Sequence, residues 1–164
     1  MSSVEAAELP DLQQVFAQLL GRVPSEQQPL LIALAERMAA QRYRSWANAS
    51  ADEKSELLAC AAREEEIASR IEALYPGAAE IQTDILSENS DLEEINRSLF
   101  AERPLLDQFA MQARGERLGA ATWRALAKRE DVPSRRDTLL ACAELEEESA
   151  LVLEGILRSR EARR

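Results

Sequence analysis

Apolar residues recur along this chain at the three- and four-residue spacing of amphipathic helices, and the whole pattern occurs twice. The stretch Leu57–Leu74 (LLACAAREEEIASRIEAL) returns as Leu139–Leu157 (LLACAELEEESALVLEGIL). Upstream of each copy, Ala35–Ala47 (AERMAAQRYRSWA) is matched by Gly115–Ala127 (GERLGAATWRALA). Two copies of one antiparallel helical hairpin predict an all-α protein, a closed four-helix bundle rather than an extended solenoid.

We expect the 164 residues to form a single domain, 1–164, with one hydrophobic core. Proline, glycine and capping residues mark the boundaries of its parts. The expected parts are a short N-terminal helix over 10–21, a first helical hairpin over 27–74, a long crossover connection over 75–103 and a second hairpin over 104–160. Within the first hairpin, Ser50 and Glu53 have the capping-box spacing, which predicts that the second long helix begins near residue 52.

Charge and composition remove several classes of function. The chain carries 30 acidic and 20 basic residues, a net charge of −10, which argues against nucleic acid as a partner. It has no histidine, which excludes Ser-His-Asp and Cys-His catalysis and histidine-ligated zinc. No apolar run approaches the roughly 18 residues of a membrane span, and the start is not signal-like. We therefore expect a cytoplasmic protein that does not enter a membrane.

The candidate chemistry lies within the apolar stripes themselves. A heptad register along each long helix places one glutamate in the middle of each stripe, with small residues one turn away. These four residues are Glu36, Glu64, Glu116 and Glu146.

Four carboxylates at one level of a core must be neutralised. One ionised, unpaired carboxylate in an apolar core costs several kcal/mol, and each further charge disfavours the others. No Lys or Arg lies within the stripes, and Arg37 and Arg117 point about 100° around the helix from the glutamates they follow. We expect these two arginines to pair with a neighbouring helix or with solvent. Three solutions stay open: shared protons, arginines reaching in from flanking positions, or divalent cations, of which two would balance four carboxylates.

The pattern resembles the ferritin-like superfamily, and within it the rubrerythrin-like branch. That family has a glutamate with an aromatic residue seven positions later, then Glu-x-x-His on the next helix, and the unit is duplicated. Glu36 with Tyr43 and Glu116 with Trp123 match the first element, and Glu64 and Glu146 match the acid of the second. The resemblance covers roughly residues 27–157. The chain departs from the family at the two histidine positions, which hold Ile67 and Ser149.

The resemblance implies a ferritin-like fold and a site for two Fe or Mn ions, with Glu36, Glu64, Glu116 and Glu146 as ligands. It also implies oxidoreductase chemistry with dioxygen or peroxide, or the handling of iron. The alternative is a metal-free, degenerate ferritin-like bundle that binds a protein or a small molecule without catalysis. A third interpretation, a purely structural helical module, predicts that Glu36 and Glu116 face solvent.

Six further residues are assigned to a pocket or to the surroundings of the site. Each also has a plainer interpretation as a core residue, above all the two cysteines and the two aromatic residues. They are Tyr43, Trp123, Gln112, Cys60, Cys142 and Ser149. We expect the protein to form a homodimer, and a protein partner stays open.

Overall fold

The structure is a computed structural model that describes residues 9–164, so residues 1–8 of the predicted domain lie outside the described part. Every regular element in residues 9–164 is helical, which confirms the predicted all-α class. The elements are α1 (Leu12–Leu20), the short 3-10 helix η1 (Ser25–Gln27), α2 (Gln28–Ala49), α3 (Lys54–Glu72), α4 (Ala78–Glu88), α5 (Leu92–Phe100), α6 (Leu105–Arg129) and α7 (Pro133–Ala162). No helix in this range combines the length and the apolar composition that crossing a membrane requires.

Local sequence sets the starts of several helices. Proline occupies the first turn of α2 and of α7, where its missing N–H removes no helical hydrogen bond. Asp11 caps α1 by accepting a hydrogen bond from the backbone N–H of Gln14 at 3.2 Å. Gly77 precedes α4 with φ of +72°, a left-handed conformation that glycine adopts without strain.

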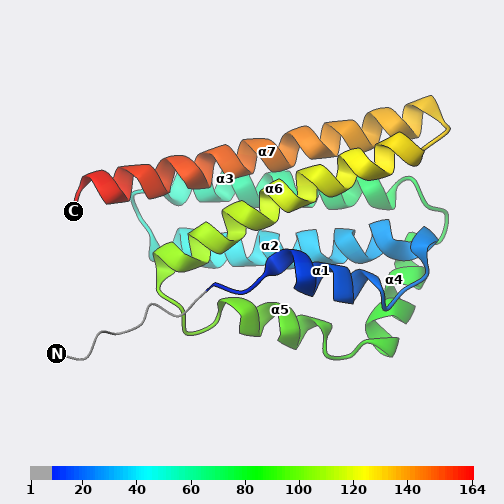
Figure 1. Ribbon diagram of the computed structural model, residues 1–164, viewed down its shortest axis with the longest axis horizontal. Coiled ribbons are helices and arrows are strands. Elements are labelled where there is room, and N and C mark those ends of the chain that lie inside the picture. The colour runs from blue at the N-terminus through cyan, green and yellow to red at the C-terminus, as the bar shows by residue number, and fades with distance from the viewer. Residues whose placement is uncertain (1–8) are drawn as a thin grey trace.

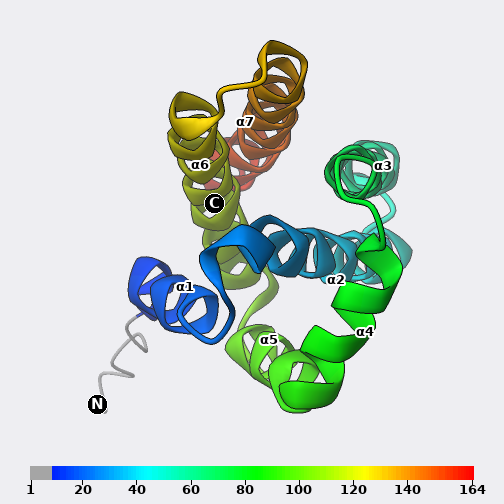
Figure 2. The ribbon, with the colours of Figure 1, turned by 90° about the vertical axis from the view of Figure 1, so that its right-hand side faces the viewer.

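Four long helices pack as neighbours in space: α2 against α3, α6 against α7, and α3 against α7. The two helices of each hairpin run in opposite directions, α2 against α3 and α6 against α7, whereas α3 and α6 run in the same direction (Figure 1). The connection from α3 to α6 passes along the molecule through α4 and α5, which both contact α2. Helices α1 and α5 lie on the side of α2 and α6 that faces away from α3 and α7 (Figure 2).

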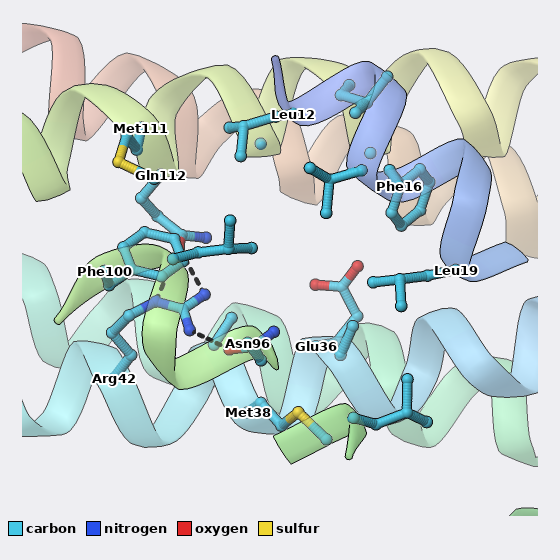
Figure 3. A pocket seen from close by; sticks show the side chains of 18 of the residues that line it. Leu12, Phe16, Leu19, Glu36, Met38, Arg42, Asn96, Phe100, Met111 and Gln112 are labelled. Carbon is cyan, nitrogen blue, oxygen red and sulfur yellow. Dashed lines mark hydrogen bonds between the residues drawn. The ribbon is translucent and has the colours of Figure 1, made fainter. Parts of the chain in front are cut away.

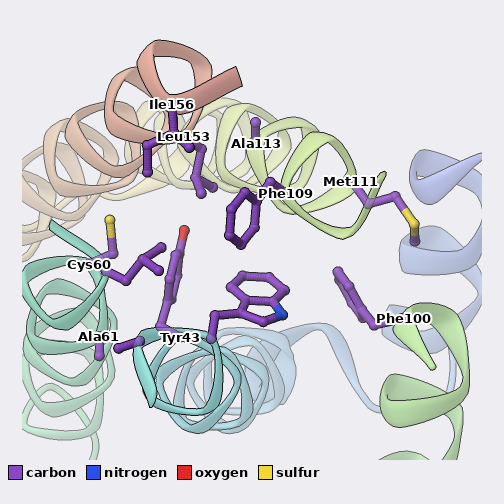
Figure 4. Close-up of a cluster of buried hydrophobic side chains, with 12 residues drawn as sticks. Tyr43, Cys60, Ala61, Phe100, Phe109, Met111, Ala113, Leu153 and Ile156 are labelled. Carbon is purple, nitrogen blue, oxygen red and sulfur yellow. The ribbon is translucent and has the colours of Figure 1, made fainter. Parts of the chain in front are cut away.

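One end of the core is rich in aromatic side chains (Figure 4). Tyr43 and Trp46 from α2 meet Phe109 from α6, with ring centroids 5.4 Å (Tyr43–Trp46) and 5.1 Å (Trp46–Phe109) apart in edge-to-face geometry. Cys60 and Leu153 complete the contact with α3 and α7. The ring of Tyr43 is therefore part of the packed core.

The other end of the core is mostly aliphatic. Ile67 and Ile71 from α3 pack with Trp123 from α6 and with Leu139 and Cys142 from α7. All five side chains are buried. Both cysteines are free, and they lie in different clusters, Cys60 in the aromatic one and Cys142 here.

The predicted capping box does not form. Ser50 ends α2, α3 begins at Lys54, and no side chain caps the first turn of α3. The Glu53 carboxylate instead accepts a hydrogen bond from Arg160 Nε at 2.8 Å, which joins the start of α3 to the end of α7. A tertiary ion pair with a nearly buried carboxylate has replaced the local cap, and the sequence spacing alone does not reveal that competitor.

The arginines next to the stripe glutamates pair outward, as predicted. Arg37 binds Glu72 across the α2–α3 contact. Arg117 forms a two-pronged pair with Glu154 across the α6–α7 contact, with N–O distances of 3.0 and 2.9 Å. Neither arginine neutralises a stripe glutamate.

Candidate metal centre

The four stripe glutamates lie between the two core clusters, one on each long helix. The exposed fractions of Glu36, Glu64, Glu116 and Glu146 are 8%, 0%, 1% and 2%. Burial of Glu36 and Glu116 excludes the purely structural module, which required both to face solvent. The heptad register predicted this burial correctly because all four long helices turn the same stripe toward a common axis.

Three of the carboxylates meet. Glu36, Glu64 and Glu146 each offer an oxygen atom, and these oxygens lie within 4.8 Å of one another. A group of three buried acidic oxygens at this separation can hold a metal ion. The residues come from three different helices, so only the tertiary fold brings them together.

Glu116, the fourth glutamate, is held in place by hydrogen bonds. Its Oε1 accepts one from the Tyr43 hydroxyl at 2.6 Å and one from Gln112 Nε2 at 2.7 Å. Its Oε2 is buried and has no hydrogen-bond donor among residues 9–164. Gln112 therefore bonds the carboxylate one turn away along the same helix.

Glu146 is also positioned by its surroundings. Trp123 Nε1 donates a hydrogen bond to Glu146 Oε1 at 3.0 Å. The carboxyl group packs directly on α6 at Gly119, where an added Cβ would lie 2.5 Å from Glu146 Oε1 and 2.7 Å from its Cδ. The Glu146 carboxylate of α7 thus occupies the space that a side chain at position 119 would need.

Glu64 is the most deeply buried of the four glutamates. Its side chain is fully buried, and its carboxylate oxygens meet no hydrogen-bond donor in the described chain apart from a proton that Glu64 can share with the Glu36 carboxyl group. Buried polar groups in native proteins almost always have partners, and an ionised carboxylate without one costs several kcal/mol. Glu64 therefore needs either a proton or a cation.

Electrostatics lead to the same conclusion. Burial, followed by the charges of Glu116 and Glu36, holds the pKa of Glu64 well above its ordinary value of 4.5. Burial and the charges of Glu36 and Glu116 likewise raise the pKa of Glu146 well above 4.5. The pKa of Glu36 is also raised, chiefly by burial. Without a cation, burial and mutual repulsion favour the protonated form of these carboxyl groups.

The charge of Arg42 acts on Glu36, Glu64 and Glu116, but Arg42 forms no ion pair with these glutamates. Its Nε and Nη2 donate to Gln112 Oε1 at 3.1 and 2.8 Å, and its Nη1 donates to Asn96 Oδ1 at 2.6 Å. The guanidinium carbon lies 3.8 Å from the centre of the Phe100 ring. Burial lowers the pKa of Arg42 to about 10. Arg42 orients Gln112, which in turn orients Glu116.

Ile67 and Ser149, at the positions that hold histidine in the family that the sequence resembles, are both fully buried. Ile67 packs in the aliphatic cluster. The Ser149 hydroxyl accepts a hydrogen bond from Arg63 Nε at 2.9 Å, and Arg63 Nη2 donates to Cys60 Sγ at 3.1 Å. Cys142 remains a thiol, because burial raises its pKa to about 12. Both cysteines pack in the core clusters, and nothing around them in the described chain indicates metal ligation.

The donor set fits a hard divalent cation. Oxygen-only sites suit Mn²⁺, Mg²⁺ and Ca²⁺, and Fe²⁺ is accommodated by carboxylates. Glu64, Glu36 and Glu146 would hold the ion, and the unpartnered Oε2 of Glu116 would complete the set. Comparison of the chain with protein-family models, with curated proteins and with solved structures gives no match.

Sequence reasoning missed three residues beside the site: Arg42, Asn96 and Arg63. Arg42 directly precedes Tyr43, but its counterpart in the second copy is Thr122, so the duplication gave no signal for it. Asn96 lies in the connection between the hairpins and reaches Arg42 only through the fold. A charged residue next to a stripe position could have identified Arg42 and Arg63, but that signal is shared by many solvated arginines.

Proposed function

We propose that this chain is a dimetal-carboxylate protein of the ferritin-like, rubrerythrin-like type that binds two Fe or Mn ions between its four long helices. The observation that carries the proposal is Glu64, a fully buried carboxylate that lies beside Glu36 and Glu146 and meets no donor in the described chain other than a proton shared with Glu36. Two divalent ions would balance the four carboxylates, and their removal would leave the raised pKa values described above.

The surrounding residues support a maintained site. Trp123 and the close approach at Gly119 fix Glu146, while Tyr43 and Gln112 fix Glu116. Residues that orient ligands are as much a part of a metal site as the ligands themselves. A core that had abandoned its acids would gain stability from apolar residues at these positions.

Bound iron or manganese would supply electron transfer with dioxygen or peroxide, the chemistry that the family resemblance implies. The chain's own residues would bind the ions, hold the carboxylates in a fixed arrangement and exclude water. The apolar clusters on both sides of the glutamates provide that exclusion.

The test is metal content and metal-dependent stability. Protein purified without chelator is analysed for metals, and the chelated protein is melted with and without Fe²⁺ (anaerobically) or Mn²⁺. We expect near two equivalents of metal and a rise in Tm of roughly 5–10 °C at 100 times Kd, since binding to the native state then adds about 2.7 kcal/mol.

Two variants make the test specific. Glu64→Gln removes one ligand charge and should abolish the shift. Glu66→Gln is the matched control, because Glu66 lies two residues away, is exposed and pairs only with Arg70. An equal shift in both variants, or no metal and no shift in the wild type, would overturn the proposal.

A metal-free bundle that binds a partner or small molecule is the second candidate. The occupants of the two histidine positions favour it: Ile67 cannot ligate a metal, and the Ser149 hydroxyl is engaged by Arg63. This candidate predicts that Glu64→Leu leaves stability equal or higher whether or not Fe²⁺ or Mn²⁺ is added.

A further inference from the structure

A cavity of about 150 Å³ lies between α1, α2, α5 and α6 and extends to the glutamates. Its walls are apolar side chains that include Leu12, Phe16, Leu19, Met38, Leu99 and Met111. Its polar lining consists of Glu36 and Glu146 together with the bonded trio Arg42, Asn96 and Gln112. The Glu36 carboxylate points into this space (Figure 3).

A glycine keeps the cavity open. Gly115 lines it from the interior of α6, one turn before Gly119. Glycine inside a helix costs about 1 kcal/mol relative to alanine. At Gly119 the Glu146 carboxylate accounts for that cost, whereas a Cβ at Gly115 would meet no other atom within 4 Å. No group of the described chain explains the missing side chain, so the space at Gly115 is available to a molecule from outside the chain.

Helix α1 covers the cavity and is loosely held. It contributes Leu12, Phe16 and Leu19 to the wall, yet none of its residues is fully buried. Elements with few buried contacts open at low free-energy cost. Opening of α1 would give a ligand access without disturbing the four long helices.

The polar groups select against an anion. The guanidinium of Arg42 already donates three hydrogen bonds to uncharged acceptors and packs on Phe100. Glu36 and Glu146 would repel the carboxylate of a ligand when they are ionised, and they offer it no positive charge when they are protonated. An apolar cavity of this volume in another protein stays dry and takes up benzene or xenon, so the volume suits one small ring or short chain.

We propose that this cavity binds a small neutral apolar molecule, the size of a monocyclic aromatic or short hydrocarbon, beside Glu36 and Glu146. The binding of this molecule does not depend on the proposed function. The interpretation of the cavity as a substrate site does rest on the proposed function at those glutamates. The ligand would lie against the face of the cluster that opens into the cavity.

Benzene is the probe for the test, with binding to the chelated protein measured by ligand-observed NMR and by the rise in Tm. We expect saturable binding to the wild type and loss of binding in Gly115→Leu, whose side chain fills the cavity. Gly155→Leu is the matched control, because Gly155 lies inside α7 away from the cavity and a Cβ there meets only Arg158 Nη2 at 3.9 Å. Ala35→Leu fills the same space from α2 should Gly115→Leu fail to fold.

Failure here is distinguishable from failure of the metal site. Glu64 does not line the cavity, so Glu64→Gln should lose metal and keep benzene, whereas Gly115→Leu should lose benzene and keep metal. No saturable benzene binding to the wild type, equal binding by the filled variants, or tighter binding of benzoate than of benzene would overturn this inference. None of these results would bear on metal content.

Discussion

At the scale of single residues, specific contacts hold two of the four buried carboxylates in position. Two of them accept hydrogen bonds from aromatic or amide donors, and within residues 9–164 a third, Glu64, meets only the neighbouring carboxyl group of Glu36. Such an arrangement lowers the stability of the metal-free protein, because a buried carboxylate without a partner must either keep its charge in an apolar core or take up a proton, and both are unfavourable at neutral pH.

Replacing Glu64 by leucine should have opposite effects with and without metal. In chelated protein, Glu64→Leu should raise the free energy of unfolding by about 1–4 kcal/mol, the range seen when apolar residues replace buried ionic groups. With Mn²⁺ present the variant should be the less stable of the two, because it forgoes the binding free energy. Urea unfolding under both conditions measures this, and a stability loss in chelated protein would contradict it.

The two glycines of α6 make a matched pair one turn apart. Gly115→Ala should stabilise the protein by about 0.5–1 kcal/mol, because alanine is the better helix former and its Cβ meets nothing. Gly119→Ala should lower metal affinity, because its Cβ would displace the Glu146 carboxylate from Trp123. Unfolding and metal titration of both variants test this, and equal metal affinity would remove Gly119 from the site.

At the scale of elements, the helices differ in how firmly they are held. The four long helices each bury several side chains, whereas α1 buries none and α5 buries only Leu92 and Phe100. Arg22, just after α1, forms an ion pair with Asp91, just before α5. This ion pair is exposed and adds little stability. The cavity is therefore enclosed by rigid walls on one side and by a weakly held cover on the other.

Hydrogen exchange should show this difference directly. Amides of α1 should exchange faster than those of α2, α3, α6 and α7, because opening α1 exposes few buried contacts. Saturation with benzene should slow exchange in α1 selectively. Mass spectrometry of peptic fragments resolves these segments, and protection of α1 equal to that of α6 would rule out its role as a cover.

At the scale of the whole molecule, the absence of histidine makes stability between pH 5 and 8 a clean report on the buried acids. A carboxyl whose pKa is raised by folding stabilises the native state below its ordinary value of 4.5, and this contribution is lost as pH rises through the folded pKa. Surface acids with lowered pKa values, such as Glu147 and Glu154, lose their contribution only as pH falls below that ordinary value.

Chelated wild-type protein should therefore become less stable from pH 5 to pH 8, by at most about 1.4 kcal/mol per pH unit for each proton involved. Glu64→Leu should reduce this slope, and the α-amino group, common to both proteins, cancels in the comparison. Urea unfolding at several pH values measures the slope. A stability that rises with pH across this window would contradict the assignment of raised pKa values to the cluster.

The sequence by itself determined the helical class, the placement of four glutamates on buried stripes and the outward pairing of Arg37 and Arg117. These features follow from a 3.6-residue period, which a single helix fixes before it meets any other. The sequence did not reveal that Glu53 would pair with Arg160 instead of capping α3. It also did not reveal Arg42 behind Gln112, or the space beside Gly115. Only tertiary structure decided these, because each depends on distances between helices that are far apart in the chain.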